Sequence, residues 1–468
     1  MDFETDELKR LLAKAVEKMS GADYADARYS GGLADLVIVS KNAKKAEQSE
    51  AHGIACRAFA NGNWGYCSTT SIDEKSVLKT AATAVKAAKA IKSKGKTGLA
   101  DVPVLEKDVL SIGKQDASQI PIEQKLFLAE EQYEHCRKFN SKIRDAKTVF
   151  STGTSCKVIA TSEGSLCSKI VGRARYYSVV VAREGDRLRQ FVGSDGIVGG
   201  MELLKEHDWT AKSDEVCKRA VELLDSVKTP VGQMPVVFRG SGGGSGLIAH
   251  EAVGHAVEGD YAMMDRSYFN GKIGKQVGAP ELNLVDSGVE NSGYGAIFFD
   301  DDAVEAKKTY LIKNGVFKTF MLDRSSASFF GLEPTGNARA QDHNRRVYVR
   351  MRNTFIEPGD WKAEEIIAET RKGVLCNHWK AGIEDPAGGS FQLFFADGYL
   401  IENGELTKSL YNISTSQTAT LDALKAIGAI GNDLKMDAGG CGKGHADYVH
   451  VGSGGPTLRI DNIIVGGA

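Results

Sequence analysis

The chain has 468 residues, about three times the length of a typical domain, so we expect two or three hydrophobic cores. Its 42% hydrophobic and 26% charged residues match an ordinary globular protein, which excludes wholesale disorder and a collagen-like chain. Lys and Arg number 59 against 61 Asp and Glu. The resulting net charge of −2 argues against a nucleic-acid partner, because no broad positive field is available to phosphate groups.

Three features of the sequence predict a cytoplasmic protein without a membrane anchor. No apolar run approaches the roughly 20 residues of a membrane span. The acidic start, Met1–Asp6, lacks the basic region and apolar segment of a secretory signal. The eight cysteines are scattered and form no Cys-x-x-Cys pair, so most are expected to be small buried hydrophobic residues and not parts of a disulfide framework or zinc ribbon.

Helices and antiparallel strands alternate through the first half of the chain. Apolar spacing, β-forming residues and turn residues predict, in chain order, a helix over Leu8–Met19, strands over Ala34–Ser40 and Gly53–Phe59, an Asn61-Gly62 hairpin turn, a helix from about Asp73 to Lys92, a long helix after Pro121, hairpins over Ala146–Ile197 with turns near Gly164 and Gly185, and a helix from about Asp214 to Ser226. The first half is therefore expected to combine long helices with an antiparallel sheet.

Two closely spaced prolines, Pro230 and Pro235, mark the predicted boundary between domains. Beyond them the chain is rich in glycine and strand formers, and it contains two similar Asn-Gly hairpin turns at 314–315 and 403–404. We therefore predict an α+β fold with a mixed α/β domain over 1–229. A predominantly antiparallel β domain, with one short helix near its start, is predicted over 230–468.

That short helix carries the chemistry that stands out. A glycine-rich loop over 241–246 leads into a segment with His250, Glu251 and His255. Imidazole is a good zinc ligand, and a neighbouring carboxylate can take a proton from metal-bound water. The histidines are five residues apart, about 140° around a regular helix, so both can face one ion only if the segment forms a π-type bulge or unwinds near Gly254. Taken alone, the pair fits zinc ligands and capping or core histidines equally well.

A third ligand is required for such a site, and Cys441 within a Gly-Gly-Cys-Gly-Lys run is the strongest candidate. A buried structural cysteine is the alternative. His445 and His450 are weaker candidates, either as ligands or as substrate-binding residues. The run Asp300–Asp302 offers oxygen ligands, but an acidic run of this kind is more often a solvated loop at the end of a strand.

Several motifs occur in one order in the second half: His250-Glu-Ala-Val-Gly-His-Ala-Val-Glu-Gly-Asp260, Thr335-Gly-Asn-Ala-Arg339, Asp397-Gly-Tyr-Leu-Ile-Glu-Asn-Gly404, Gly440-Cys-Gly-Lys443 and the Pro456–Gly467 segment. Through them the sequence resembles the TldD/PmbA family, with a looser match in the first half. That family contains a zinc peptidase with a His-Glu-x-x-x-His segment and a metal-free companion that lacks it. Because this chain has the segment, it resembles the TldD-like zinc-peptidase branch.

The resemblance implies that His250, His255 and Cys441 bind Zn²⁺ and that Glu251 is the general base. It also implies a dimer, either a homodimer or a heterodimer with a metal-free PmbA/TldE-like paralogue, that admits unfolded peptide. The glycines near Cys441 further predict that an extended peptide adds as a strand. Two other hypotheses are a phosphate-binding glycine loop before the helix, which lacks the P-loop ending, and a non-catalytic interaction subunit of a TldD/PmbA-type complex.

Overall fold

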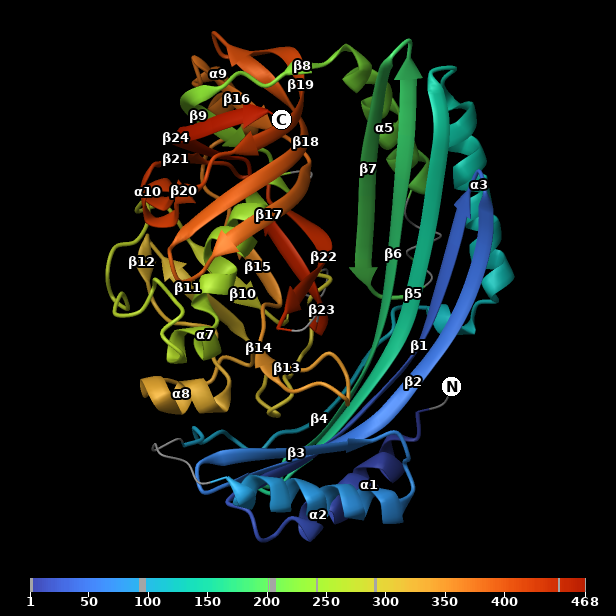
Figure 1. Ribbon diagram of the computed structural model, residues 1–468, viewed down its shortest axis with the longest axis vertical. Coiled ribbons are helices and arrows are strands. Elements are labelled where there is room, and N and C mark those ends of the chain that lie inside the picture. Colours follow the sequence, from blue (N-terminus) through green and yellow to red (C-terminus); the bar gives the residue numbers. More distant parts are fainter. Residues whose placement is uncertain are drawn as a thin grey trace.

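The computed structural model describes residues 3–91, 98–200, 202, 208–240, 243–289, 293–444 and 447–467. The fold is mixed α/β and rich in strands, as the sequence predicted. Figure 1 shows a long, curved sheet built from the first half of the chain beside a thicker body built from the second half. Among the described residues, no helix is long and apolar enough to span a membrane.

One seven-stranded sheet organises the first half. Its strands are β1 (Tyr24–Ser40), β2 (Ala43–Ala60), β3 (Asn63–Thr69), β4 (Glu106–Ser111), β5 (Ile143–Thr161), β6 (Leu166–Glu184) and β7 (Arg187–Val198). They run in the order β3-β2-β1-β5-β6-β4, with β7 also paired to β6, and only β4 is parallel to its neighbour. The predicted Asn61-Gly62 turn connects β2 to β3, and both residues have the positive φ angles that such a turn requires.

The helices of the first half cover this sheet in two groups. They are α1 (Thr5–Lys18), α2 (Glu74–Ala90), α3 (Ile122–Phe139) and α5 (Trp209–Glu222), with short 3₁₀ turns η1 (Ala117–Gln119) and η2 (Leu223–Asp225). Asp73 caps α2 by accepting the backbone N–H of Ser76. The pair α1 and α2 buries one apolar core against the sheet, around Leu12 and Ala81, and the pair α3 and α5 buries others, around Tyr176 and Val216.

Two sheets form most of the second half. A six-stranded sheet has the order β12-β11-β10-β15-β23-β22, and a nine-stranded sheet has the order β17-β18-β16-β9-β24-β19-β8, with β20 and β21 attached to its side. The bounds of these strands and of a separate pair, β13 with β14, are β8 (Val227–Lys228), β9 (Gly232–Phe238), β10 (Leu284–Ser287), β11 (Lys308–Lys313), β12 (Val316–Phe317), β13 (Ala338–Arg339), β14 (Tyr348–Val349), β15 (Asn353–Ile356), β16 (Lys372–Cys376), β17 (Trp379–Asp385), β18 (Ser390–Glu402), β19 (Glu405–Thr415), β20 (Thr418–Ala419), β21 (Ile427–Ile430), β22 (Lys435–Lys443), β23 (Asp447–Gly455) and β24 (Leu458–Gly467).

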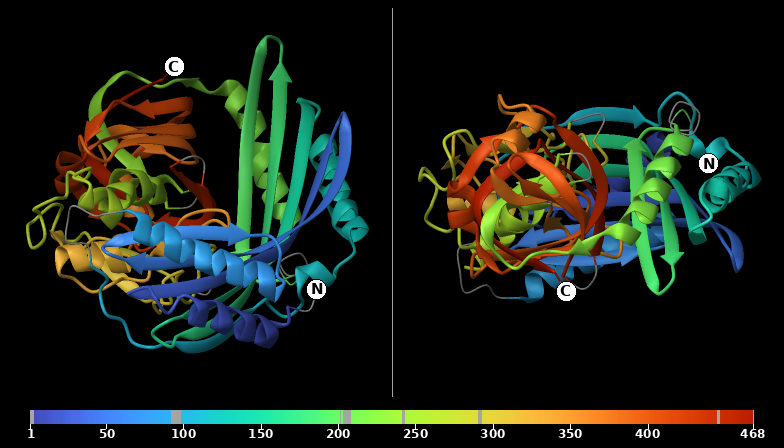
Figure 2. Two further views of the ribbon diagram at one scale, coloured as in Figure 1. Left: turned by 60° about the horizontal axis from the view of Figure 1, so that its bottom comes forward. Right: turned by 90° about the horizontal axis from the view of Figure 1, so that it is seen from above.

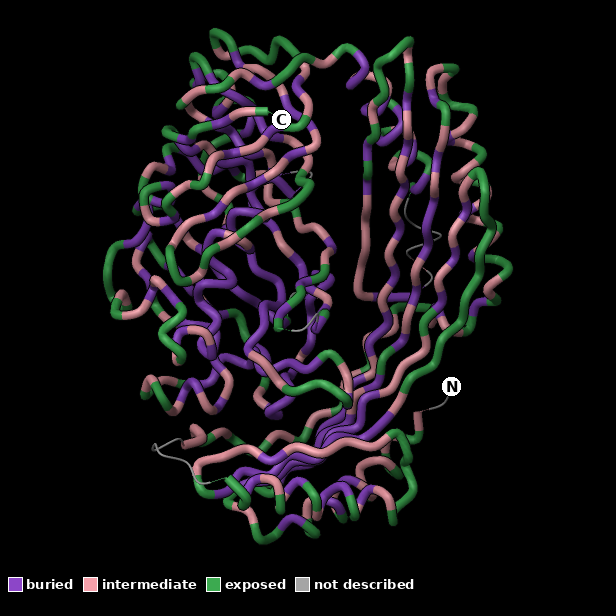
Figure 3. The backbone as a smooth tube through the Cα atoms, viewed as in Figure 1, coloured by how far each residue is buried: buried purple, intermediate pink, exposed green. Residues whose placement is uncertain are grey.

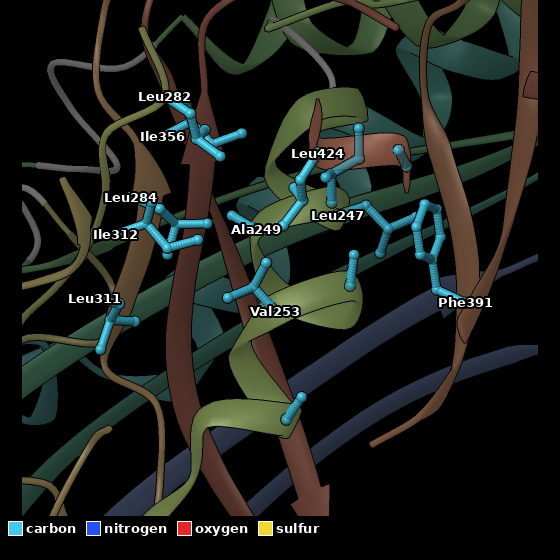
Figure 4. Close-up of a cluster of buried hydrophobic side chains, with 14 of the residues drawn as sticks. Leu247, Ala249, Val253, Leu282, Leu284, Leu311, Ile312, Ile356, Phe391 and Leu424 are labelled. Atoms are coloured by element: carbon cyan, nitrogen blue, oxygen red, sulfur yellow. The ribbon is translucent and has the colours of Figure 1, made fainter. Parts of the chain in front are cut away.

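A helical segment lies between these two sheets and forms the centre of the largest core. It consists of α6 (Gly244–Leu247), a π-helix η3 (Ile248–Gly254), a 3₁₀ turn η4 (His255–Val257) and α7 (Gly259–Met263). Seen from above in Figure 2, the strands of the second half curve around it. Leu247, Ala249 and Val253 point into the apolar cluster drawn in Figure 4, which draws Leu284 from one sheet and Phe391 from the other. This packing holds the segment rigidly.

Two predictions about the elements need correction. The second half has more than one short helix, because α8 (Arg324–Phe330), α9 (Ala363–Ala368) and α10 (Thr420–Lys425) follow the central segment. Its strand pairs are mostly antiparallel, as predicted, and the pairs of β9 with β16, β15 with β23 and β8 with β19 are parallel. Helix α5 begins at Trp209 and not near Asp214, since Asp208 accepts the backbone N–H of Ala211 and caps the helix earlier.

The run Asp300–Asp302 is buried, at 0%, 1% and 4% exposure, so the predicted solvated loop is wrong. These carboxylates instead join the two halves of the chain. Asp302 accepts a 2.8 Å bond from Arg57, and Asp301 lies 2.7 Å from the Lys157 ammonium. Figure 3 shows that buried residues continue from the lower part of the long sheet into the second half. Burial of paired charges therefore fixes the halves against each other.

Candidate metal centre

The π-helix brings the two histidines of the central segment together. The backbone N–H of His255 donates to the carbonyl of His250, five residues earlier, in place of the four-residue step of an α-helix. The extra residue in the turn rotates His255 back toward His250. The two imidazole centroids lie 5.1 Å apart, and their planes are nearly perpendicular at 85°. The five-residue spacing therefore places both rings on one side of the segment.

Cys441 reaches the same place from β22. Its Sγ lies 3.5 Å from Nε2 of His255. One ligand atom each from His250, His255 and Cys441 lies within 4.8 Å of the others, and the three residues are buried. Burial alone raises the pKa of the Cys441 thiol, but the neighbouring His255 and His250 bring this pKa well below its usual value. Two imidazoles and a thiolate are donors that zinc accepts, so these residues fit a metal ion.

A buried charge chain supports His255 from behind. Nδ1 of His255 lies 3.6 Å from a carboxylate oxygen of Glu258, and Glu258 is in turn 2.8 Å from the Lys443 ammonium. Lys443 also contacts Asp260 at 2.6 Å. Burial raises the pKa of Glu258, yet Lys443 and His255 bring it down to about 2, so this carboxylate is ionised. It orients the ring so that Nε2 faces Cys441, the arrangement typical of metal-binding histidines.

Glu251 faces the other side of the cluster, toward β17. Ligand atoms of Glu251, His255 and Glu384 lie within 4.8 Å of one another. Gly382 of β17 packs so closely that a Cβ there would lie 2.3 Å from Cγ of Glu251. Burial raises the pKa of Glu251 to about 7, and the nearby Glu384 adds to the rise. A carboxyl group with this pKa can take up and release a proton near neutral pH.

The remaining predicted site residues lie elsewhere. His445 and residues 241–242 of the glycine loop fall outside the described residues. His450 pairs with Gly440 across the β22–β23 hairpin, one position from the Cys441–Val449 pair, so its side chain points to the opposite face from Cys441. Its ring contacts Tyr294 instead, with centroids 5.0 Å apart. The structure therefore does not bring His450 to the metal cluster.

Four polar residues of this centre had no role assigned from the sequence. Glu258, three residues after His255, carried a visible signal, because a carboxylate at that spacing shares a side with the histidine. Asp260 and Lys443 stood within the quoted motifs, but only the fold pairs them. Glu384 had no signal at all. It lies on an ordinary strand, 133 positions after Glu251, and reaches the site because β17 is the end strand of its sheet.

Comparison with known proteins decides the family. The model of the PmbA/TldA metallopeptidase C-terminal domain matches residues 231–467, the central-domain model matches 115–224, and the domain 1 model matches 35–88. The chain belongs to the PmbA/TldD metallopeptidase family. The family predicted from the sequence motifs is thereby confirmed, and the C-terminal match contains the whole His250–His255–Cys441 cluster.

Relatives extend over nearly the full chain. A metalloprotease of Methanocaldococcus jannaschii is 32% identical over 96% of this chain and 98% of its own length. A zinc metalloprotease TldD homologue of Saccharolobus solfataricus is 28% identical over 96% of this chain and 97% of its own. Among solved structures, TldE of Thermococcus kodakarensis aligns with a TM-score of 0.78 at 18% identity, over 98% of this chain and all of its own. At that identity the likeness establishes the fold alone.

Proposed function

We propose that this chain is a zinc-dependent peptidase that hydrolyses unfolded or extended peptides with broad sequence tolerance. The observation that carries the proposal is the convergence of His250, His255 and Cys441 in one buried cluster, with Glu251 beside them. Three protein ligands leave one position of a tetrahedral ion open for chemistry. Membership of a metallopeptidase family and the zinc named for the Saccharolobus relative support the same assignment.

Metal binding, positioning and proton transfer are each assigned to different residues of the chain. His250, His255 and Cys441 hold the ion, and Glu258 keeps the His255 ring in place. When bound, zinc lowers the pKa of water and polarises the carbonyl that is attacked. Glu251 accepts the proton of the attacking water and delivers it to the leaving amine. Its pKa of about 7 suits both steps near neutral pH.

An extended peptide is expected to bind as an added strand. β17 and β22 are end strands of their sheets, and both run past the cluster. β17 places Gly382 against Glu251, and β22 carries Cys441 itself. Main-chain hydrogen bonds to an end strand do not depend on the side chains of the peptide, so tolerance of sequence follows. A peptide-library digest with one strict cleavage motif would contradict this mode of binding.

Substitution of the base tests the proposal. Glu251→Gln keeps the size of the side chain and all three ligands, and we expect kcat to fall by roughly 10²–10⁴-fold while zinc content is unchanged. Glu364→Gln, at an exposed position on α9, is the control and should retain full activity. A protein that binds no zinc, with peptide hydrolysis unchanged in Glu251→Ala, would favour a non-catalytic interaction subunit of a PmbA/TldD-type complex instead.

The assembly is proposed to be a dimer, either of two copies or of this chain with a metal-free PmbA/TldE-like paralogue. The fold-level likeness to TldE supports the second form, because paralogues of one fold present related surfaces. Light scattering on the purified chain, alone and mixed with the paralogue, measures the mass directly. A monomer in both samples would contradict the proposal.

A further inference from the structure

A polar cavity lies between the two halves of the chain. It is on the face of the β22–β23 hairpin away from Cys441. Its volume is about 260 Å³. The first half contributes β5 and β6, and the second half contributes β23 and the segments around Ala296 and Ala340. In Figure 1 these strands face each other where the long sheet meets the second half. The charged and titratable side chains that line the cavity are Lys157, Lys169, Arg173, Asp300, Asp301, Arg339 and His450, and uncharged residues that include Tyr448 complete the lining.

Three cationic side chains of this cavity donate hydrogen bonds to backbone carbonyls and pair with no carboxylate among the described residues, and two of them, Lys169 and Arg173, also lie over the rings of Phe299 and Tyr294. Lys169 donates to Ile297 at 3.0 Å and to Phe299. Arg173 donates to the carbonyls of Tyr294 and Ala296, and Arg339 to those of Met351 and His450. Lys169 and Arg339 are 7% and 8% exposed. Carbonyl oxygens satisfy the N–H groups of these side chains but leave their charges without counter-ions.

The two carboxylates of the cavity already have partners. Asp301 accepts two hydrogen bonds from the Lys157 ammonium, at 2.7 and 2.8 Å, and one from the backbone N–H of Ala340. Asp300 accepts three backbone N–H groups, from residues 302, 304 and 338. With both carboxylates ionised and all four Lys and Arg side chains protonated, the lining carries an excess of two positive charges. Burial lowers the pKa of Lys169 to about 7, so without a bound anion this ammonium is only partly protonated at neutral pH. An uncompensated excess of buried charge is costly for the folded chain.

His450 adds an unused polar atom to the same space. Its Nδ1 has no hydrogen-bond partner although it is buried. Burial and the nearby Arg173, Arg339 and Arg175 bring the pKa of His450 well below its usual value, so the ring is neutral and can donate one N–H. The positive field that lowers this pKa is the field that attracts an anion.

We propose that this cavity binds a small oxyanion, either free phosphate or a carboxylate carried by a ligand. Lys169 and Arg173 line the cavity from the first half and Arg339 lines it from the second, so cationic donors face the cavity from both halves. Charge-assisted hydrogen bonds from such donors to an oxyanion are short and strong. The bound anion joins β6 of the first half to β23 of the second. The site is separate from the metal centre, since the two lie on opposite faces of one hairpin.

Titration with phosphate at constant ionic strength tests the site. We expect saturable binding of inorganic phosphate by calorimetry and a matching rise in the melting temperature of the full chain. Lys169→Met and Arg173→Gln each remove one uncompensated cation, and each should weaken phosphate binding at least tenfold. Arg189→Gln is the control, because Arg189 stacks on Tyr411 in a different cavity and should leave binding unchanged. Two variants are used so that a folding defect in one does not decide the outcome.

A short peptide with a free carboxyl terminus, compared with its amide, identifies the source of the anion. Competition by the free peptide alone assigns the site to a peptide carboxylate, and phosphate binding without such competition assigns it to free anions. Both results support the oxyanion site. Equal phosphate responses in all the variants and the unaltered chain, or no response in the unaltered chain to either phosphate or peptide, would overturn it.

Discussion

Cys441 differs from the other buried cysteines because imidazole rings, and not apolar atoms alone, surround its sulfur. Burial raises the pKa of Cys156 and Cys167 to about 12, whereas His255 and His250 outweigh burial at Cys441. Thiolates bind metals and thiols do not. Cys441 therefore differs in chemistry from Cys156 and Cys167, although all three are buried.

Removal of this sulfur is expected to release the metal. Cys441→Ser keeps the volume of the side chain but replaces a soft thiolate with a neutral hydroxyl, so zinc affinity should fall at least tenfold, the loss typical of damaged metal shells. Zinc per chain, measured by mass spectrometry of the dialysed protein, gives the result. Cys167→Ser is the control and should keep its zinc. Full occupancy in Cys441→Ser would remove Cys441 from the ligand set.

His378 connects α5 to the nine-stranded sheet and gives stability a dependence on pH. Its Nδ1 lies 2.8 Å from Asp397 and its Nε2 3.4 Å from Glu215. Burial alone lowers the pKa of His378, but the hydrogen bonds to Asp397 and Glu215 raise it to about 9. Because the folded pKa exceeds the unfolded value of about 6.5, the stabilisation is complete below pH 6.5 and is lost as the pH rises through 9.

His378→Gln should therefore lower the free energy of unfolding most at low pH. The difference in pKa between the folded and unfolded states gives a decrease of roughly 3 kcal/mol near pH 6, and this decrease shrinks toward zero above pH 9.5. Melting temperatures of the variant and the unaltered chain, measured by calorimetry from pH 6 to 10, give the difference. A difference that grows with pH would contradict the assigned direction.

At the scale of single residues, the sequence can reveal a candidate site when its residues lie close together in the chain. His250 and His255, with Glu251 between them, stood out as a candidate pair, although their five-residue spacing alone left zinc ligands and core histidines equally open. The acidic run Asp300–Asp302 was misinterpreted, because such runs are usually solvated and its partners, Arg57 and Lys157, lie more than a hundred positions away. No local pattern reports a partner at that separation.

Among the elements, the π-helix η3 decides whether the cluster forms. It has no spare volume at Gly254, where a Cβ would lie 2.2 Å from Sδ of Met351 and 3.2 Å from the carbonyl of Ala249. The absence of a side chain lets the wide turn pack against Met351 next to β15. The geometry of the two histidines thus depends on a residue that binds nothing.

Gly254→Ala is expected to disturb the cluster without touching a ligand. Overpacking of this size costs about 1–3 kcal/mol and displaces the turn, so both melting temperature and zinc occupancy should fall. Gly439→Ala on β22 is the matched control, since its Cβ would meet only Val451 at an ordinary 3.8 Å. Unchanged zinc occupancy in Gly254→Ala would show that the turn tolerates the shift.

Turns with a clear sequence motif could be predicted, whereas very short helices could not. The Asn-Gly turns at 314–315 and 403–404 occur as expected, with positive φ at all four residues. Helices α8, α9 and α10 have only six or seven residues, too few for an apolar period to appear. The parallel strand pairs join segments distant in the chain, so their partners are set by packing.

For the whole molecule, ion pairs link the two halves. Arg324 makes two 2.7 Å contacts with Glu163, and Asp301 and Asp302 hold Lys157 and Arg57. These links cross the predicted division between 1–229 and 230–468, which stays a prediction, as does the cytoplasmic location. We therefore expect the two parts to unfold together.

Burial, and not ion-pair distance, should determine the strength of these links. Asp301→Asn leaves the Lys157 charge buried without its partner, so we expect the free energy of unfolding to fall by about 3–5 kcal/mol. Glu74→Gln is the matched control, because Glu74 contacts Lys14 at 2.6 Å with both side chains half exposed, and its loss should stay below about 1 kcal/mol. Calorimetric melting of both variants makes the comparison, and equal losses would contradict it.

Because the chain is synthesised from its N-terminus, the two histidines of the proposed metal site are made long before its cysteine. His255 and Cys441 are 186 positions apart, on a helix and on a late strand. A growing chain on the ribosome thus carries both imidazoles long before the sulfur has been translated. On the proposed function, a truncated product that ends before Cys441 lacks one of the three proposed ligands, so we expect unfinished copies of the chain to have no peptidase activity.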